Sequence, residues 1–160
     1  MNISFEVEGV KETVAAFDKV EKGITDLRQG ATWMRVRQAF YRIQKEIFAS
    51  EGGASGAGKW QALSPAYAVV KLKKYGNKPI LQATGAMYKE FTSTAGKTQE
   101  QAQSLTFTFN SPAGYHMNRG GKMPYRTALE LTDGQKEELL EPIKLRLRQL
   151  ADNAKLLSLR

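Results

Sequence analysis

The chain has 160 residues, no cysteine, one histidine and a formal net charge of +8. The lack of cysteine excludes disulfides, thiol nucleophiles and Cys-ligated metal centres, and a single histidine leaves little basis for a histidine-based metal site. No apolar run approaches the roughly 20 residues of a membrane-spanning helix, so we expect no membrane partner.

A chain of this length fits one domain over residues 1–160 and can bury a core without disulfides or metals. Its first residues have neither the basic start nor the apolar stretch of a signal peptide. We therefore expect the protein to be made and used in a cytoplasm.

Positive charge is concentrated in two spans that contain no acidic residue. The span 52–89 holds Lys59, Lys71, Lys73, Lys74, Lys78 and Lys89. The span 101–129 holds Arg119, Lys122 and Arg126. Such spans suit nucleic acid or an acidic protein partner, and a solvated basic face without a partner explains them equally well.

The N-terminal third predicts one strand and two amphipathic helices. Residues 3–8 alternate apolar and polar, which is the period of a half-buried strand. Apolar residues then recur every three or four positions over 10–28, which predicts a helix. The same spacing predicts a second helix over 33–47. Its apolar stripe is Trp33, Val36, Phe40, Ile43 and Ile47. We expect this stripe to be core, with docking against a neighbouring subunit as the alternative.

Residues 51–59 are rich in glycine and predict a flexible loop. The spacing from Gly53 to Lys59 matches the start of a phosphate-binding loop, but Trp60 stands where that loop needs serine or threonine. A helix is also predicted before this loop, where a phosphate-binding loop follows a strand. We therefore expect no nucleotide site.

Ser64 and Pro65 form a helix start, with a hydroxyl at the N-cap and proline at the first helical position. They predict a helix over about 65–75, which places Ala68, Leu72 and Tyr75 on one side and Lys71 and Lys74 on another. The segment from Thr84 to Phe91 follows, and its type is left open.

The clearest strand is predicted over 104–110, where leucine and phenylalanine alternate with threonine. The polar residues 93–103 before it are interpreted as a hairpin loop, and 126–131 as a further edge strand. Together with the helices, these elements predict an α+β fold, with long N-terminal helices and a C-terminal helix packed on a small, mostly antiparallel sheet.

The last helix begins with the capping box Thr132–Gln135. Pro142 lies inside this helix and is expected to kink or divide it. The tail, 155–160, is expected to be frayed. The predicted buried side is Leu139 or Leu140, Ile143, Leu147 and Leu150.

No group of side chains is placed for catalysis. His116 has no partner nearby in sequence that would complete a base–nucleophile pair. The acidic residues of 137–141 lie near a helix start, where the helix dipole favours them. No carboxylate pair, triad or metal cluster emerges, so we expect neither an enzyme nor a cofactor.

Three short motifs follow one another along the chain. The first is Trp-x-x-Leu-Ser-Pro at 60–65 with a lysine at 71, and the second is Ile-Leu-x-x-Thr-Gly-x-Met at 80–87. The third, Met-Pro-x-Arg-x-x-Leu-x-Leu-Thr at 123–132, leads into the last helix. In this order they resemble the motifs of the phage virion morphogenesis family, the Mu-like tail-completion proteins of tailed phages. Met87 and the pair Thr127-Ala128 depart from the usual pattern.

The resemblance implies a structural virion protein of a tailed bacteriophage that acts late in assembly. Members of the family look like subunits of homo-oligomeric rings at the neck or tail terminator, around the channel through which DNA passes. The implied partners are further copies of the chain, neighbouring neck or tail proteins and, non-specifically, channel DNA. The implied location is the virion, and the host cytoplasm during assembly.

The residues that we expect at subunit or partner contacts are Lys59, Trp60, Lys71, Lys73, Lys74, Lys78, Arg119 and Arg126. For Arg126 we favour a structural ion pair over a ring contact. Two other classes stay open. A basic DNA-binding accessory protein would bind duplex in a salt-dependent way. A virion enzyme, such as a nuclease or a peptidoglycan-acting protein, would need acids that this chain lacks.

Overall fold

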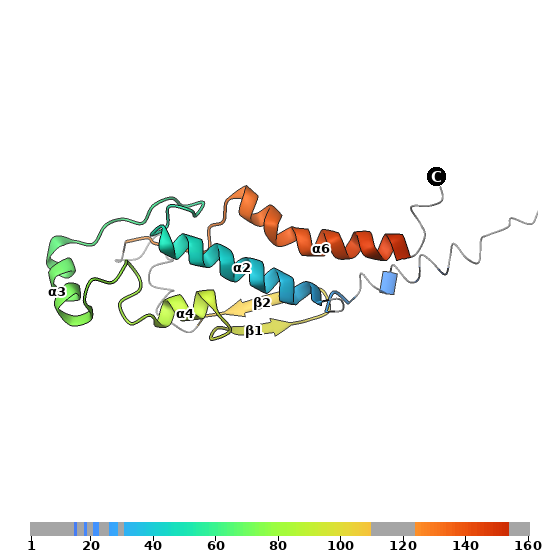
Figure 1. Cartoon of the computed structure of the whole chain (residues 1–160), viewed down its shortest axis with the longest axis horizontal. Helices are drawn as coiled ribbons and strands as arrows, with labels where there is room; N and C mark the ends of the chain where they lie inside the picture. The colour runs from blue at the N-terminus through green and yellow to red at the C-terminus, as the bar shows by residue number, and fades with distance from the viewer. Residues whose placement is uncertain are drawn as a thin grey trace, which may run out of the picture.

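One long helix, α2 (Thr32–Ala49), runs through the middle of the structure. The computed structural model describes residues 15, 18, 21–22, 26–28, 31–109 and 124–153. Helix α6 lies along one side of α2, and α4 with a two-stranded hairpin lies along the other (Figure 1). Helix α3 forms one end of the described structure. The further elements are α3 (Pro65–Tyr75), α4 (Ala86–Thr92), β1 (Lys97–Glu100), β2 (Leu105–Thr108) and α6 (Asp133–Asn153).

The arrangement confirms the expected α+β class. The predicted strand over 3–8, most of the predicted helix over 10–28 and the tail over 155–160 lie outside the described residues. His116, Arg119 and Met123 lie outside them as well.

The apolar stripe predicted for 33–47 forms the buried side of α2. Its five members, Trp33, Val36, Phe40, Ile43 and Ile47, are all buried, which confirms the prediction that the stripe is core. The ring of Phe40 stacks on Phe107 of β2 with centroids 4.3 Å apart, and Phe91 of α4 stacks on Phe109 at 4.0 Å. These aromatic contacts join α2, α4 and the hairpin into one core.

The hairpin corrects part of the expectation for 93–103. Strand β2 confirms the strand predicted over 104–110, but Lys97–Glu100 form strand β1 rather than a loop. The two strands pair antiparallel, with Lys97 opposite Thr108 and Glu100 opposite Leu105. Strand β1 escaped prediction because it is a polar edge strand, and an edge strand with little buried surface carries no alternating apolar signal.

The prediction of an edge strand over 126–131 is wrong, because this stretch has no strand partner in the described structure. Its main chain is instead held by groups from distant elements. The amide of Gln44 donates to the carbonyl of Ala128 at 2.9 Å, and the indole of Trp60 donates to that of Thr127 at 2.9 Å. The backbone N–H of Gly56 donates to Glu130 at 2.6 Å. These donors satisfy the carbonyls that a sheet would otherwise pair.

The glycine-rich loop, 51–59, packs closely against its surroundings. Gly52 has φ +90°, and a Cβ at this position would lie 2.4 Å from Cδ1 of Trp60. A Cβ on Gly56 would lie 2.9 Å from the carbonyl oxygen of Leu131. The buried hydroxyl of Ser55 donates to the carbonyl of Gly52 at 2.8 Å. Glycine is needed here for close approach and for positive φ.

Helix α6 begins with the predicted capping box. Thr132 N donates to Oε1 of Gln135 at 2.9 Å, and Gln135 N donates back to Oγ1 of Thr132 at 3.3 Å. Pro142 does not divide the helix, which is continuous from Asp133 to Asn153. The turns on either side of this proline are joined by Lys144, which pairs with Glu137 and, at 3.6 Å, with Glu141.

The buried side of α6 differs from its prediction in part. Leu139 and Ile143 pack against the core clusters, as expected. Leu140 and Leu147 are exposed, and so is Leu145. Helix α6 therefore carries apolar side chains on its solvent side as well as towards α2.

Candidate functional site

Helix α3 has the bounds that its start signals predict. Pro65 occupies the first turn, and Oγ of Ser64 accepts a hydrogen bond of 3.4 Å from the backbone N–H of Tyr67. At the other end Gly76, with φ +74°, donates to the carbonyl of Leu72 at 2.9 Å. Both ends are thus defined by local signals, independently of packing.

Lys71 is the buried residue of α3, although it was expected at a partner contact. Its side chain is 6% exposed, and its Nζ donates to the carbonyls of Lys78 and, at 3.1 Å, Pro79. The ammonium group therefore holds the segment that leads out of α3. This lysine belongs to the framework of the site and contributes little to the basic surface.

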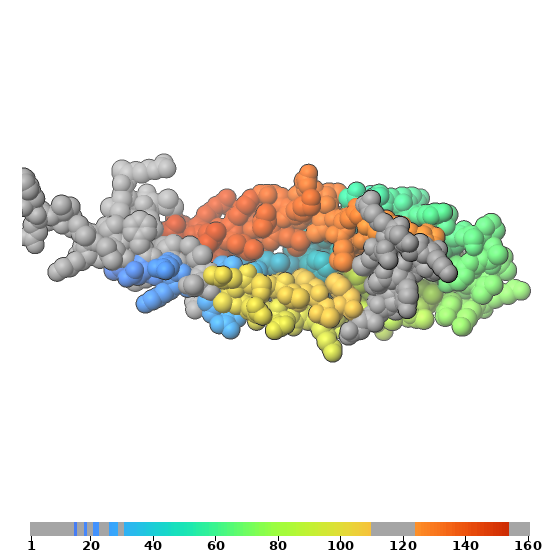
Figure 2. Space-filling model, turned by 180° about the vertical axis from the view of Figure 1, so that it is seen from behind, coloured from blue at the N-terminus to red at the C-terminus, as the bar shows by residue number. Residues whose placement is uncertain are grey.

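Helix α3 exposes four large apolar or aromatic side chains. Tyr67, Val69, Val70 and Leu72 are all exposed to half or more of their full extent. Lys73 and Lys74 of the same helix are also exposed. Helix α3 stands at one end of the described structure (Figure 2), and these side chains are exposed there. Apolar side chains grouped on one projecting helix are typical of a protein contact.

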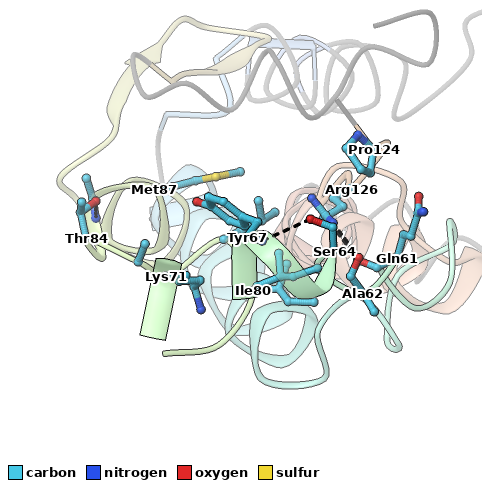
Figure 3. A pocket seen from close by; sticks show the side chains of 14 residues that line it. Gln61, Ala62, Ser64, Tyr67, Lys71, Ile80, Thr84, Met87, Pro124 and Arg126 are labelled. Atoms are coloured by element: carbon cyan, nitrogen blue, oxygen red, sulfur yellow. Dashed lines mark hydrogen bonds between the residues drawn. The ribbon is translucent and has the colours of Figure 1, made fainter. Parts of the chain in front are cut away.

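A cavity of about 720 Å³ lies behind α3, between this helix and the rest of the structure. Tyr67 stands over its middle, Ser64 and Arg126 lie on one side, and Thr84 and Met87 lie on the other (Figure 3). The residues that line it are Gln61, Ala62, Leu63, Ser64, Tyr67, Lys71, Ile80, Leu81, Ala83, Thr84, Ala86, Met87, Pro124 and Arg126. The walls are largely apolar, and the charged side chains among these residues are both cations.

Arg126 is buried in the wall of this cavity, with 4% of its surface exposed. Its Nε donates to the carbonyl of Gln61 at 2.9 Å and its Nη2 to that of Ala62 at 3.2 Å. Burial lowers the pKa of the guanidinium below its usual value. Two main-chain carbonyls thus stand where we expected a carboxylate partner, and the structural ion pair does not form among the described residues.

The cavity brings the three sequence motifs together. The first contributes Leu63, Ser64 and Lys71, the second Ile80, Leu81, Thr84 and Met87, and the third Pro124 and Arg126. The hydrogen bond from the Trp60 indole to Thr127 joins the first motif to the third. Segments that are far apart in the sequence therefore converge on one site.

The structure separates the other expected contact residues into two groups. Lys59, Lys73, Lys74 and Lys78 are exposed, as a contact requires. Trp60 is 4% exposed and packs edge-on against Phe48 with ring centroids 5.3 Å apart, so it belongs to the core. Arg119 lies outside the described residues.

Two features of the site were not predicted from the sequence. The first is the exposure of large apolar side chains on α3, whose signal is the pair Val69-Val70 just before Lys71. The second is the cavity itself, because its walls come from segments with no sequence pattern in common. The capping signals of α3 locate the helix but say nothing about which face is covered.

Within the part of the chain that the structure describes, no cluster of three or more histidine, cysteine or acidic residues is placed to hold a metal ion. No helix in the same part is both long and apolar enough to cross a membrane. Comparison with protein-family models, with curated proteins and with solved structures found no match.

Proposed function

We propose that the protein is a structural subunit of a homo-oligomeric ring in the virion of a tailed bacteriophage. In this proposal it acts at the head–tail junction, in the neck or as a tail terminator, and is made in the host cytoplasm. The convergence of the three motifs on one cavity behind an exposed helix supports this role most directly. Three motifs that line one cavity can serve the binding of a partner, which requires no catalytic group.

The exposed surfaces of the structure support self-assembly. Val69, Val70 and Leu72 lie at one end, on α3. A second exposed apolar set, Leu140, Leu145 and Leu147, lies along α6. Two different apolar surfaces on one subunit suit a head-to-tail contact, and such contacts close into rings when the rotation between neighbours permits.

Charge adds to the specificity of the proposed contact. Lys73, Lys74 and Lys78 are exposed at the α3 end, within a span that has no acidic residue. Acidic surfaces on adjacent ring proteins, or the phosphates of channel DNA, are complementary to such an end. A basic DNA-binding accessory protein is the alternative that these same lysines favour.

The test is the mass of the purified full-length protein by light scattering over a range of concentrations and salt, with negative-stain imaging of large species. We expect closed rings whose share of the protein rises with concentration. Val70→Asp should prevent their formation, because it places a charge in the apolar contact. Met34→Asp is the matched control, since Met34 is an exposed apolar residue of α2, away from α3.

Two outcomes would contradict the proposal. Rings that form equally well with Val70→Asp would exclude α3 as the contact. A monomer at every concentration that shifts only on addition of duplex DNA would favour the DNA-binding alternative, with a mass that falls back as salt rises.

A further inference from the structure

Arg126, in the wall of the cavity behind α3, keeps hydrogen-bond donors that the described residues do not use. A guanidinium has five N–H donors, and the bonds from Nε to Gln61 and from Nη2 to Ala62 use one donor each. Both N–H groups of Nη1 and the second one of Nη2 make no hydrogen bond within the described structure. Two neighbouring nitrogens of this kind form the fork with which arginine holds both oxygens of a carboxylate.

The charges of the cavity suit a single negative group. Among the described residues its lining contains no acid, and Arg126 is 4% exposed. A buried cation that is bonded only to carbonyls is costly, so an anion that reaches it would be bound favourably. The other cation of the lining, Lys71, already donates to the carbonyls of Lys78 and Pro79. The expected ligand is therefore a monoanion, because a polyphosphate would need further cations.

The remaining walls favour an anion with an apolar body. Leu63, Ile80, Leu81 and Met87 line the cavity, and Tyr67 stands over its middle (Figure 3). The volume of about 720 Å³ lies in the range of sites that enclose a small molecule. A small hydrated anion would gain nothing from these walls, whereas an apolar carboxylate would use both the walls and the cation.

A hydrocarbon chain suits these walls better than a peptide does. Each residue of a peptide would bring an amide N–H and a carbonyl, and both would need partners inside a largely apolar cavity. The carbonyls of Gln61 and Ala62 already receive Arg126. A saturated chain carries no polar group besides its carboxylate, so it leaves nothing unpaired.

We propose that the cavity behind α3 binds an aliphatic monocarboxylate. The carboxylate lies against the unused N–H groups of Arg126, and the hydrocarbon chain lies between Tyr67 and the apolar walls. This ligand site is separate from the exposed side chains of α3, and the inference does not depend on the proposed ring function.

The test is isothermal titration calorimetry of the full-length protein with octanoate, below the concentration at which octanoate forms micelles. We expect saturable binding of one octanoate per chain. Octan-1-ol, which has the same chain length without the charge, should bind at least about tenfold more weakly. Acetate, which has the charge without the chain, should also bind at least about tenfold more weakly.

Variants locate the binding site. Arg126→Met should weaken octanoate binding at least about tenfold, because it removes the charge that receives the carboxylate. Val70→Asp should leave binding unchanged, since Val70 is exposed on α3 outside the lining. Thermal melts show whether each variant is folded.

A second pair of variants leaves Arg126 and its acceptors in place. Ala86 is an exposed residue of the lining, so Ala86→Trp should occupy part of the cavity and weaken octanoate binding at least about tenfold. Ala66→Trp adds the same bulk to an exposed residue of α3 outside the lining and should leave binding unchanged. This pair decides the question if Arg126→Met fails to fold.

Several results would overturn the inference. One is the absence of saturable octanoate binding, and another is equal binding by Ala86→Trp and Ala66→Trp. Equal binding by folded Arg126→Met and the unchanged protein would exclude the carboxylate contact. A loss of binding in Val70→Asp would place octanoate on the outer surface of α3. Tighter binding of N-acetyl-leucyl-leucine than of octanoate would assign the cavity to the carboxyl end of a peptide and overturn the choice of an aliphatic acid.

Discussion

The indole Nε1 of Trp60 donates a hydrogen bond of 2.9 Å to the carbonyl of Thr127, which joins two buried residues 67 positions apart. Next to Thr127 along the chain, Arg126 donates to the carbonyls of Gln61 and Ala62. Each of the two segments therefore donates side-chain hydrogen bonds to main-chain carbonyls of the other. This mutual attachment places one wall of the cavity.

Replacing Trp60 by phenylalanine should lower the free energy of unfolding by about 1–3 kcal/mol, because the carbonyl of Thr127 is left buried without a donor. Urea denaturation measures this change. Trp33→Phe is the matched control, since its indole also donates to a distant carbonyl, that of Gln101 at 2.9 Å, but lies away from the cavity. Trp33→Phe should cost less stability, because its bond is part-buried whereas that of Trp60 is buried. Equal losses of stability in the two variants would contradict the importance of burial at the Trp60 bond.

Alanine at Gly52 should destabilise the protein more than alanine at Gly58. Both glycines have positive φ, +90° and +78°, so both substitutions strain the backbone by about 1–2 kcal/mol. At Gly52 the new Cβ would also lie 2.4 Å from the Trp60 ring, whereas nothing lies within 4 Å at Gly58. Thermal melts of the two variants compare the costs directly. A lower melting temperature for Gly58→Ala than for Gly52→Ala would show that the Trp60 contact is unimportant.

Lys71→Met should cost about 1–3 kcal/mol of stability, because it removes the donor that Lys78 and Pro79 share. Lys73 is exposed on the same helix and serves as the control. Lys73→Met should change stability by no more than about 0.5 kcal/mol. Chemical denaturation of the pair measures the difference. Equal stability of the two variants would mean that Lys71 makes no net contribution through its buried ammonium group.

Pro142→Ala should stabilise the protein, by up to about 3 kcal/mol, since it restores a backbone donor within the continuous helix α6. Guanidinium denaturation measures the gain. Gly134→Ala, in the exposed first turn of the same helix, is a reference for helix propensity alone and should add no more than about 1 kcal/mol. A loss of stability for Pro142→Ala would indicate that the proline ring makes contacts that alanine cannot replace.

The carboxyl group of Asp26 should have an unusually low pKa. Its oxygens accept from Nε and Nη2 of Arg28 at 2.8 and 2.7 Å, and these bonds lower its pKa from 3.8 to about 2. A carboxyl whose pKa is depressed by folding contributes stability above its unfolded pKa, and this contribution is lost as the pH falls towards about 2. Titration followed by NMR should place the pKa of Asp26 near 2 and, in Arg28→Ala, near 4. A value near 4 in the unchanged protein would contradict the ion pair.

The sequence predicts those elements whose signals are local. Helix α3 was located by Ser64 and Pro65, and the start of α6 by the capping box at Thr132. The buried stripe of α2 followed from its helical spacing. Each of these signals acts over a few residues, so no knowledge of the tertiary structure was needed.

The errors concern residues whose environment is decided by distant groups. The edge strand predicted over 126–131 failed because Gln44, Trp60 and Gly56 bond its carbonyls from outside any sheet. Lys71 appeared to be a surface charge, since the loop carbonyls that receive it are seven and eight positions further along the chain. The cavity could not be predicted, because three segments meet there without any shared periodicity.

The attachment of residues 127–130 through their carbonyls has a consequence for how this part of the chain tolerates change. A carbonyl is the same in every amino acid, so the bonds at Thr127, Ala128 and Glu130 place no demand on side-chain identity there. The demand falls on the two side-chain donors, Gln44 and Trp60, and on Gly56, where a Cβ would lie 2.9 Å from the carbonyl oxygen of Leu131. Saturation mutagenesis should therefore find exposed Leu129 permissive and these remote donors restrictive. The conformation of this segment is encoded largely outside it.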